Sequence, residues 1–330
     1  MGIKFSFVAV LTLILVVFLG VKSAHLEHVF GVYVPYAAVC VFFLGFIYRI
    51  VLWARSPVPF RIPTTGGQQQ SLPWVKQNKL DNPSTTAGTI GRMLLEILVF
   101  RSLFRNTKME LREGPKLTYQ LEKWLWLAGL AFHYSFLVIF LRHLRFFIDP
   151  IPFFVQIFEK ADSVMQVGLP LVYLSDLVLV AAVSYLFIRR VVLPQMRYIS
   201  LAADYFPLLL ILALAITGIL MRYFIRIDVT SVKDLTISLV TFHPVVPKDL
   251  SVLFYIHFFL ICVLFTYFPF SKLMHLGGVF LSPTRNLPND SRMKQHLNPW
   301  NYPVKVHTYE AYEDEFREKM IEAGLPVEKE

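Results

Sequence analysis

The sequence predicts an all-α fold, a polytopic bundle of six membrane-spanning helices with a cytoplasmic loop and tail. Hydrophobic residues make up 55% of the 330 residues, whereas soluble domains contain about 45–50%. These residues are gathered in long blocks, and the charged residues lie between the blocks. A helix needs roughly 20 apolar residues to cross the hydrocarbon core of a bilayer. The blocks therefore indicate membrane spans rather than the cores of soluble domains.

Six segments have the length and composition of a span, namely residues 4–22, 32–53, 122–147, 169–189, 205–225 and 251–275. The first segment resembles a secretory signal. However, Lys22 stands third before the best cleavage point, after Ala24, where a small residue is required. We therefore expect a retained first helix.

The basic residues of the connecting segments predict the orientation in the cell membrane. Cytoplasmic loops of membrane proteins carry an excess of Lys and Arg, and the turn 190–204 contains Arg190 and Arg197. The segments 23–31, 148–168 and 226–250 are sparse or mixed in charge. We therefore expect both termini and the loop 54–120 in the cytoplasm, and this topology explains the net charge of +9 without nucleic acid. The basic residues of that loop are Arg55, Arg61, Lys76, Lys79, Arg92, Arg101, Arg105, Lys108, Arg112 and Lys116.

The sequence divides into two N-terminal spans (1–53), a basic loop (54–120), a four-helix core (121–275) and a tail (276–330). In the loop, residues 64–83 are rich in Gly, Gln and Pro and are predicted to be irregular. Residues 89–108 combine apolar residues at helical spacing with basic ones, which predicts an interfacial amphipathic helix. The tail ends acidic but keeps aromatic residues, so we expect it to dock on a soluble partner rather than to remain a solvating chain.

The two cysteines exclude two kinds of redox centre. Cys40 and Cys262 lie inside apolar blocks, where a small buried side chain is the ordinary role of a free cysteine. The sequence contains no C-x-x-C-H motif for covalent haem attachment. It also lacks the set of cysteines that an iron–sulphur cluster requires.

Four histidines lie within the predicted spans. His133 and His143 belong to the third span, and His257 and His275 belong to the sixth. Ionisable groups at membrane depth are costly and usually functional. Because the third span runs outward and the sixth runs inward, His143 matches His257 near the outside and His133 matches His275 near the cytoplasm.

The spacings of the two pairs are unequal. Ten residues of helix span about 15 Å and eighteen span about 27 Å, so two regular helices would require each pair to slant by about 6 Å. Pro269 removes a backbone donor and is expected to bend the sixth helix. Two cofactors at two depths fit these spacings better than one.

Haem is the cofactor that these histidines favour. Two neutral imidazoles can bind one iron from opposite faces of a porphyrin. A zinc or copper site would add carboxylates or thiolates, whereas Phe, Leu, Ile and Tyr surround these histidines in the sequence. The sequence therefore predicts two haem b groups, with His133, His143, His257 and His275 as the metal ligands.

Two other functions remain open at this point. The histidines can hydrogen-bond neighbouring helices in a haem-free membrane anchor, or the protein can be a transporter subunit for a metal or a proton. The transporter is disfavoured because the sequence shows no internal repeat and few membrane carboxylates apart from Asp176 and Asp204. Asp176 either relays protons or forms a hydrogen bond within the bundle, and we favour the hydrogen bond.

Haem propionates need cations, and basic residues occur at both predicted depths. Each can equally be a marker of topology. Gly129 and Gly218 either let a macrocycle approach the backbone or serve ordinary helix packing. The outer cations are Arg142, Arg145, Arg222 and Arg226, and the inner ones are Lys272, Arg189 and Arg190.

The helix with His-x9-His followed by a helix with His-x17-His resembles the gamma (cytochrome b) subunits of respiratory nitrate reductases. The extra first helix, the basic loop and the segment FSKLMHLGGVFLSPTRNLPN are similar to DsrM. DsrM proteins are membrane cytochromes of the sulphite-reduction-associated DsrMKJOP complex and have relatives in membrane-bound heterodisulphide reductases. The resemblance covers roughly residues 30–290.

This resemblance implies a dihaem b electron-transfer subunit of a complex rather than a stand-alone enzyme. Such subunits exchange electrons with menaquinone and pass them to a cytoplasmic iron–sulphur subunit, here DsrK-like, beside other subunits of the complex. Carried over, His143 and His257 would bind the outer haem, and His133 and His275 the inner one. In the nitrate reductase family a glycine precedes the outer ligand of the first haem-bearing helix, whereas this sequence has Arg142 there.

Overall fold

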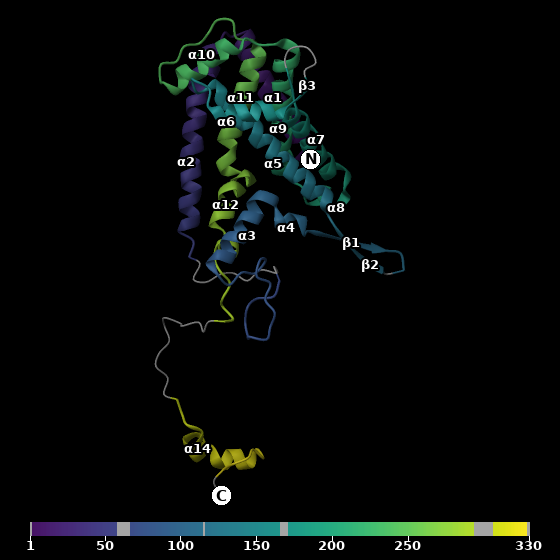
Figure 1. Ribbon diagram of the computed structural model, residues 1–330, viewed down its shortest axis with the longest axis vertical. Coiled ribbons are helices and arrows are strands. Elements are labelled where there is room, and N and C mark those ends of the chain that lie inside the picture. Colours follow the sequence, from purple (N-terminus) through teal and green to yellow (C-terminus); the bar gives the residue numbers. More distant parts are fainter. Residues whose placement is uncertain (1, 58–66, 115, 166–170, 294–305, 329–330) are drawn as a thin grey trace.

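The computed structural model describes residues 2–57, 67–114, 116–165, 171–293 and 306–328, and it is a helical membrane bundle as predicted (Figure 1). Arg61 and residues 294–305 of the tail lie outside this description. Within the described residues, five helices are long and apolar enough to cross a membrane. They are α1 (Gly2–Lys22), the π-helical turn η1 with α2 (Val29–Ala54), α5 with η2 (Lys123–Phe146), α9 with η3 (Ala202–Ile225) and α11 with η4 (Val252–Phe270).

The predicted span 169–189 corresponds to α7 (Leu174–Val192). Its 19 residues would reach about 28 Å, yet Asp176, Arg189 and Arg190 near its ends make it more polar than the five spans. The helix packs beside α5 and α9. There Leu179 and Val183 join a buried apolar cluster, so α7 is a full member of the bundle.

The main core lies where α1, α9 and α11 meet. Val17, Leu210 and Leu260 come from these three helices and are completely buried there. The outward faces of α1 and α2 expose large apolar side chains such as Phe5, Leu44 and Ile47. Such faces are expected where the surrounding solvent is lipid.

The bundle has two distinct ends. At one end, which we name the loop end, Ser6 near the start of α1 donates to the Ala202 carbonyl at 3.0 Å, and Lys272 pairs with Asp204 at 2.6 Å. The segment after α2 and the segment after α11 leave from this same end (Figure 1). The opposite, cap end is covered by α10 (Val229–Val240), and Tyr36 of α2 donates to the Leu239 carbonyl at 2.9 Å.

The prediction of one bent helix over residues 251–275 was wrong, because the helix breaks. It ends at Tyr267 and continues as two 3₁₀ turns, Phe268–Phe270 and Lys272–Met274, before α12 (His275–Leu281). Ser271 between the turns is extended, with φ −120° and ψ 178°. A Cβ at Gly45 of α2 would lie 2.8 Å from the Pro269 Cβ, so this glycine lets α2 pack against the break.

The segment between α2 and α5 is partly helical and partly β. The amphipathic helix predicted over 89–108 is present as α3 (Thr86–Val99) and α4 (Arg101–Phe104). Its last residues instead enter β1 (Thr107–Arg112), which pairs antiparallel with β2 (Lys116–Leu121) in a hairpin that we did not predict. The described part of 64–83 contains neither helix nor strand, as expected.

Buried polar contacts tie this segment to the chain beyond α13 (Pro283–Asn286). Asn289, 1% exposed, donates to Asn82 at 2.6 Å and accepts from Gln69 at 2.8 Å. Arg101 forms an ion pair with Asp81 at 2.9 Å. Burial alone would raise the pKa of Asp81, but hydrogen bonds from Arg101 and Arg105 hold this pKa below its usual value.

The described part of the tail ends in α14 (Tyr309–Glu322). Thr308 caps its start by accepting from the Ala311 amide at 3.2 Å. Glu313 is buried and lies 3.3 Å from Arg317 one turn later. The remaining short elements are α6 (Phe153–Asp162), α8 (Pro194–Ile199) and the strands β3 (Ser163–Met165) and β4 (Val172–Tyr173).

Candidate functional site

The structure brings the four histidines together as the two pairs expected from their depths. At the cap end, His143 at the end of α5 faces His257 of α11, with ring centroids 6.5 Å apart and planes at 20°. Nearer the loop end, His133 of α5 faces His275, the first residue of α12, at 5.9 Å and 79°. We name these the cap-end pair and the loop-end pair.

The helix break explains how both pairs form despite their unequal spacing. His133 and His143 are ten residues, or about 15 Å, apart on the regular helix α5. Between His257 and His275 the chain passes through two 3₁₀ turns and an extended residue instead of five helical turns. The two centroid distances are therefore similar, at 6.5 and 5.9 Å, although the spacings in the sequence are unequal.

Hydrogen bonds fix the orientation of three of the four rings through the backbone. The Nδ1 atoms of His133, His143 and His275 lie 2.7, 2.7 and 2.8 Å from carbonyl oxygens one turn earlier. Because a carbonyl only accepts, each Nδ1 carries the proton and each Nε2 keeps its lone pair. Metal-ligating histidines in proteins are usually held in this way by their second nitrogen.

The fourth ring is held by a side chain. The Thr217 hydroxyl lies 2.8 Å from Nδ1 of His257 and 2.8 Å from the Ala213 carbonyl. Since the hydroxyl proton goes to that carbonyl, Nδ1 of His257 donates to the Thr217 oxygen. A Cβ on the neighbouring Gly218 would stand 3.4 Å from His257 Cε1, so a glycine there lets α9 lie close to the ring.

The separations of the paired rings agree with ligation of one metal from two sides. Two imidazoles at metal–nitrogen distances of about 2 Å would place their centroids about 6 Å apart. Among the described residues, no three His, Cys, Asp or Glu side chains gather into a site for a bare metal ion. A pair of imidazoles fits a porphyrin, because the macrocycle supplies the remaining ligands of the iron.

Apolar rings line both pairs. Phe146 packs edge-on to His143 with centroids 5.7 Å apart. Phe100 and Phe132 lie 4.9 and 4.8 Å from His133. The cap-end rings are half-buried within the bundle, whereas both loop-end rings are exposed. The two sites therefore differ in how much surrounding protein covers them.

Two of the four predicted cap-end cations already have carboxylate partners. Buried Arg142 lies 2.7 Å from Asp176 and 3.2 Å from Asp162, and Arg145 lies 2.6 Å from Glu159. Tyr223 also donates to Asp176 at 2.9 Å, so Asp176 is hydrogen-bonded within the bundle, as we favoured. These charges are compensated by the protein itself.

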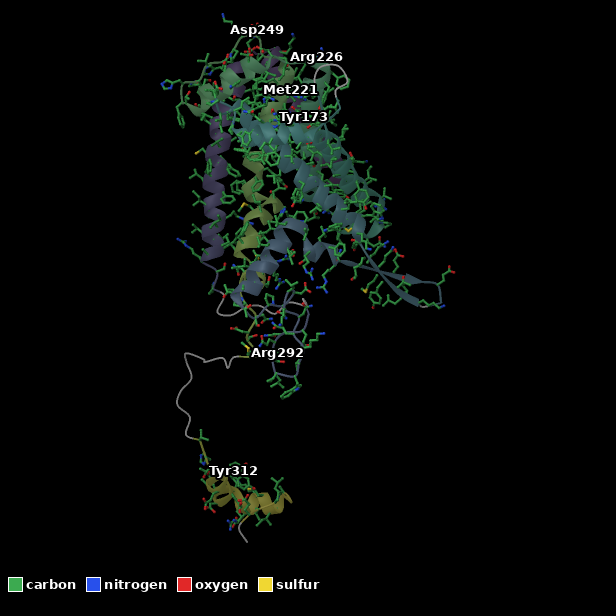
Figure 2. All side chains as sticks on the ribbon, viewed as in Figure 1. Tyr173, Met221, Arg226, Asp249, Arg292 and Tyr312 are labelled. Carbon is green, nitrogen blue, oxygen red and sulfur yellow. The ribbon has the colours of Figure 1, made fainter. Side chains whose placement is uncertain are left out.

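Arg222 differs from Arg142 and Arg145. Among the described residues it has no carboxylate partner, whereas a buried Nε without a hydrogen bond is common to Arg222 and Arg142. Its guanidinium stacks 4.1 Å from the ring centre of Tyr173 and donates to the Leu171 carbonyl at 3.2 Å. Figure 2 places Tyr173 and Arg226 at the cap end, and Arg222 lies about one turn beyond Gly218, which faces His257.

At the loop end, the three predicted cations are paired and two others are not. Lys272 and Arg190 lie near Asp204, at 2.6 and 3.9 Å, and Arg189 lies 2.8 Å from Glu122. Sequence reasoning missed two cations with buried, unpartnered nitrogens, Arg49 on α2 and Arg92 on α3. Their sequence context gave no signal, because compensation by an acid depends on three-dimensional neighbours.

The two glycines for which we left two roles open, Gly129 and Gly218, have different surroundings in the structure. Gly218 faces His257, as a site that needs close approach would require. A Cβ on Gly129 would instead meet Leu103 of α4 at 3.2 Å. Gly129 therefore serves helix packing, although its carbonyl accepts the hydrogen bond from His133.

Comparison with known proteins agrees with this geometry. Residues 93–289 match the model of the nitrate reductase gamma subunit family. An Hdr-like menaquinol oxidoreductase cytochrome b-like subunit of Archaeoglobus fulgidus is 50% identical over 280 residues, covering 83% of each chain. The protein of the same description from Archaeoglobus profundus is 43% identical over 274 residues, covering 81% of each.

Proposed function

Because this chain belongs to the nitrate reductase gamma subunit family, we propose that it is a dihaem b membrane subunit linking menaquinol to a cytoplasmic iron–sulphur subunit. Membership in this family, together with the two relatives, makes the chain a membrane cytochrome b-like subunit of a quinone-linked oxidoreductase. The haem ligands, the electron route and the partner are the proposed part.

One observation carries the proposal. Two histidine pairs stand at centroid distances of 6.5 and 5.9 Å, and all four Nδ1 atoms are engaged, which leaves four Nε2 lone pairs for metal. A histidine that only joins helices would direct a nitrogen to the neighbouring helix. In three of these histidines, Nδ1 donates to a backbone carbonyl of the same chain segment, which supports a role as metal ligands over a role in helix association.

The residues have separate roles around each haem. His143 and His257 would hold the cap-end haem, and His133 and His275 the loop-end haem. The guanidinium of Arg222 would bind a propionate of the cap-end haem, because a half-buried cation without an acid is stabilised by an anionic partner. Arg142 and Arg145 form ion pairs with Asp176 and Glu159. They are therefore weaker candidates for binding a propionate than the sequence alone suggested.

Bound haems would carry single electrons through the hydrocarbon core between the two ends of the bundle. The chain would hold the two groups through His133 and His143, which are about 15 Å apart along α5, and would shield the cap-end pair from water. The name of the two relatives contains menaquinol, and we extend that electron donor to this chain.

The orientation of the chain in the membrane follows from the charge of the loop end. The basic segment 54–120 leaves from that end, and positive-inside topology puts such a segment in the cytoplasm. Both described chain ends would then be cytoplasmic, electrons would enter near the cap-end haem, and they would leave near the loop-end haem. An iron–sulphur subunit of the DsrK type, within a sulphite- or sulphate-respiring complex, is the acceptor that the resemblance to DsrM favours.

Haem stoichiometry tests the proposal. A pyridine haemochrome assay on the purified chain should give two haem b per polypeptide, and a menaquinol analogue should reduce them. A content near zero with intact folding would overturn the proposal and favour a haem-free anchor. One haem per chain would also contradict it.

A further inference from the structure

The hairpin β1–β2 has one face that is apolar except for Thr107 at its base. Met109 pairs with Tyr119, and Leu111 pairs with Leu117. Side chains on alternate strand positions share a face, so these four residues and Leu121 lie on the same side. Their exposed fractions are 63% (Met109), 75% (Leu111), 51% (Leu117), 65% (Tyr119) and 41% (Leu121).

The opposite face of the hairpin is polar. It carries Lys108, Glu110, Lys116, Thr118 and Gln120. Lys108 and Glu110 form an ion pair on this face. The two faces thus differ in the same way as the two faces of an amphipathic helix that lies on a membrane.

An isolated two-stranded hairpin is marginally stable in water without a surface that covers its apolar side. Contiguous exposed apolar patches on soluble faces mark contacts with proteins or membranes. This face therefore needs an occupant, and its position in the molecule indicates which one.

The base of the hairpin lies at the boundary of a membrane span. Glu122 follows β2 directly, donates from its amide to the Asn106 carbonyl at 3.0 Å and pairs with Arg189 of α7. The span α5 begins at the next residue, Lys123. From this base the hairpin extends sideways from the foot of α5, away from the bundle (Figure 1).

Two exposed aromatic residues lie on helices connected to this base, since α5 begins there and α8 follows α7. Trp124 in the first turn of α5 is 73% exposed, and Tyr198 of α8 is 92% exposed. Tyr and Trp are enriched at the level of the lipid headgroups. Tyr119 on the apolar face of the hairpin therefore continues an aromatic belt that starts on the bundle.

We propose that the apolar face of β1–β2 lies on the lipid at the loop-end surface of the membrane, with its polar face turned to water. Continuity with α5 and with the aromatic belt favours lipid over a protein partner. Lys116 at the edge of the hairpin adds attraction to anionic headgroups. The hairpin would anchor the N-terminal end of α5 at the membrane surface.

Spin labels on adjacent residues of opposite faces test this proposal. Tyr119→Cys and Gln120→Cys would be made separately in the full chain, with Cys40→Ala and Cys262→Ala removing the native thiols. Each labelled protein would be placed in nanodiscs that contain phosphatidylglycerol. Collision with oxygen, which partitions into lipid, and with a water-soluble nickel chelate would then be measured by power saturation.

The label at 119 should collide severalfold more with oxygen than with the nickel chelate, relative to the label at 120. Equal access of both labels to the nickel chelate would overturn the proposal. Protection of the label at 119 that occurs only after a soluble subunit is added would also overturn it, in favour of a protein contact. Leu111→Cys on the apolar face repeats the test if Tyr119→Cys does not fold, and neither readout depends on bound haem.

Discussion

The cap-end and loop-end pairs present the same two ligands in different surroundings. The cap-end pair stands between two continuous helices, half-buried, with rings at 20° to each other and with Thr217 and Gly218 against His257. The loop-end pair stands where α11 has broken, exposed, with rings at 79°.

This difference shows which parts of the chain support each site. The membrane bundle alone builds the cap-end site. The loop-end site also depends on Phe100, which belongs to the segment outside the bundle and reaches His133 at 4.9 Å. Changes in that segment should therefore affect one site and spare the other.

The largest expected effect comes from removing a ligand. His143→Ala should lower the haem content from two to one per chain, because the cap-end iron loses one of its two protein ligands while the loop-end pair is untouched. His275→Ala should remove the other haem. Pyridine haemochrome and redox difference spectra measure both changes, with His243→Ala, outside both pairs, as a control that keeps two haems.

The two single-ligand variants also test whether the sites are independent. If His143→Ala removed both haems from a protein that still folds, the separation into two sites would be incorrect.

A second, smaller effect concerns the unpaired cation. A charge-assisted hydrogen bond contributes about 1.5–3 kcal/mol, so Arg222→Gln should weaken retention of the cap-end haem by roughly tenfold or more. Transfer of haem to apomyoglobin measures this retention. Arg145→Gln is the matched control, since Arg145 already pairs with Glu159, and equal losses in both variants would contradict the role given to Arg222.

A third variant, Thr217→Val, should change the midpoint potential of the cap-end haem and leave the haem content unchanged. Thr217→Val removes the oxygen that accepts from Nδ1 of His257, which makes the ligand less electron-rich and should raise the midpoint potential of the cap-end haem only. Thr217→Ser should restore the original value in a redox titration. Thr266→Val on α11 is the control, because Thr266 donates to the Cys262 carbonyl of its own helix and not to a histidine ring of the described pairs. A shift in the potential of the loop-end haem would argue against this assignment.

The smallest effect concerns α3 and α4, the helices outside the bundle whose connecting residue Phe100 contacts His133 of the loop-end site. Asp81→Asn should loosen α3 and α4 by removing the ion pairs with Arg101 and Arg105, and should slightly increase access of reductant to the loop-end haem alone. The pKa of Asp81 is lowered from 3.8. The ionised Asp81 carboxylate therefore stabilises the packing of α3 and α4 fully at pH values above 3.8. This stabilisation is lost as the pH falls through the lowered pKa.

Stopped-flow reduction by a reductant that is stable in acid, compared at neutral pH and at a pH below the lowered pKa of Asp81, would detect this loss of stabilisation. The wild type should approach the variant only in acid. A difference between the two proteins that persisted in acid would exclude the carboxylate as the cause.

Much of this arrangement could be predicted from the sequence. The depth pairing of His143 with His257 and of His133 with His275 required only the opposite directions of two apolar helices. The hairpin was missed although Met109, Leu111, Leu117 and Tyr119 alternate with polar residues around a Gly, which is the pattern of paired strands.

Other features depend on tertiary packing and were beyond the sequence. Pro269 indicated a disturbance of the helix, but its extent is set by packing against Gly45. The partners of Arg142 come from α6 and α7, so the sequence could not distinguish this compensated arginine from the uncompensated Arg222.

Low-temperature electron paramagnetic resonance of the oxidised protein tests the two-site claim most directly. Nearly parallel imidazole planes separate the two iron orbitals that they contact, whereas nearly perpendicular planes leave these orbitals close in energy and give a much more anisotropic signal. We predict two low-spin ferric signals, a rhombic one that disappears in His143→Ala and a highly anisotropic one that remains. A single type of low-spin signal, or the loss of both in that variant, would contradict it.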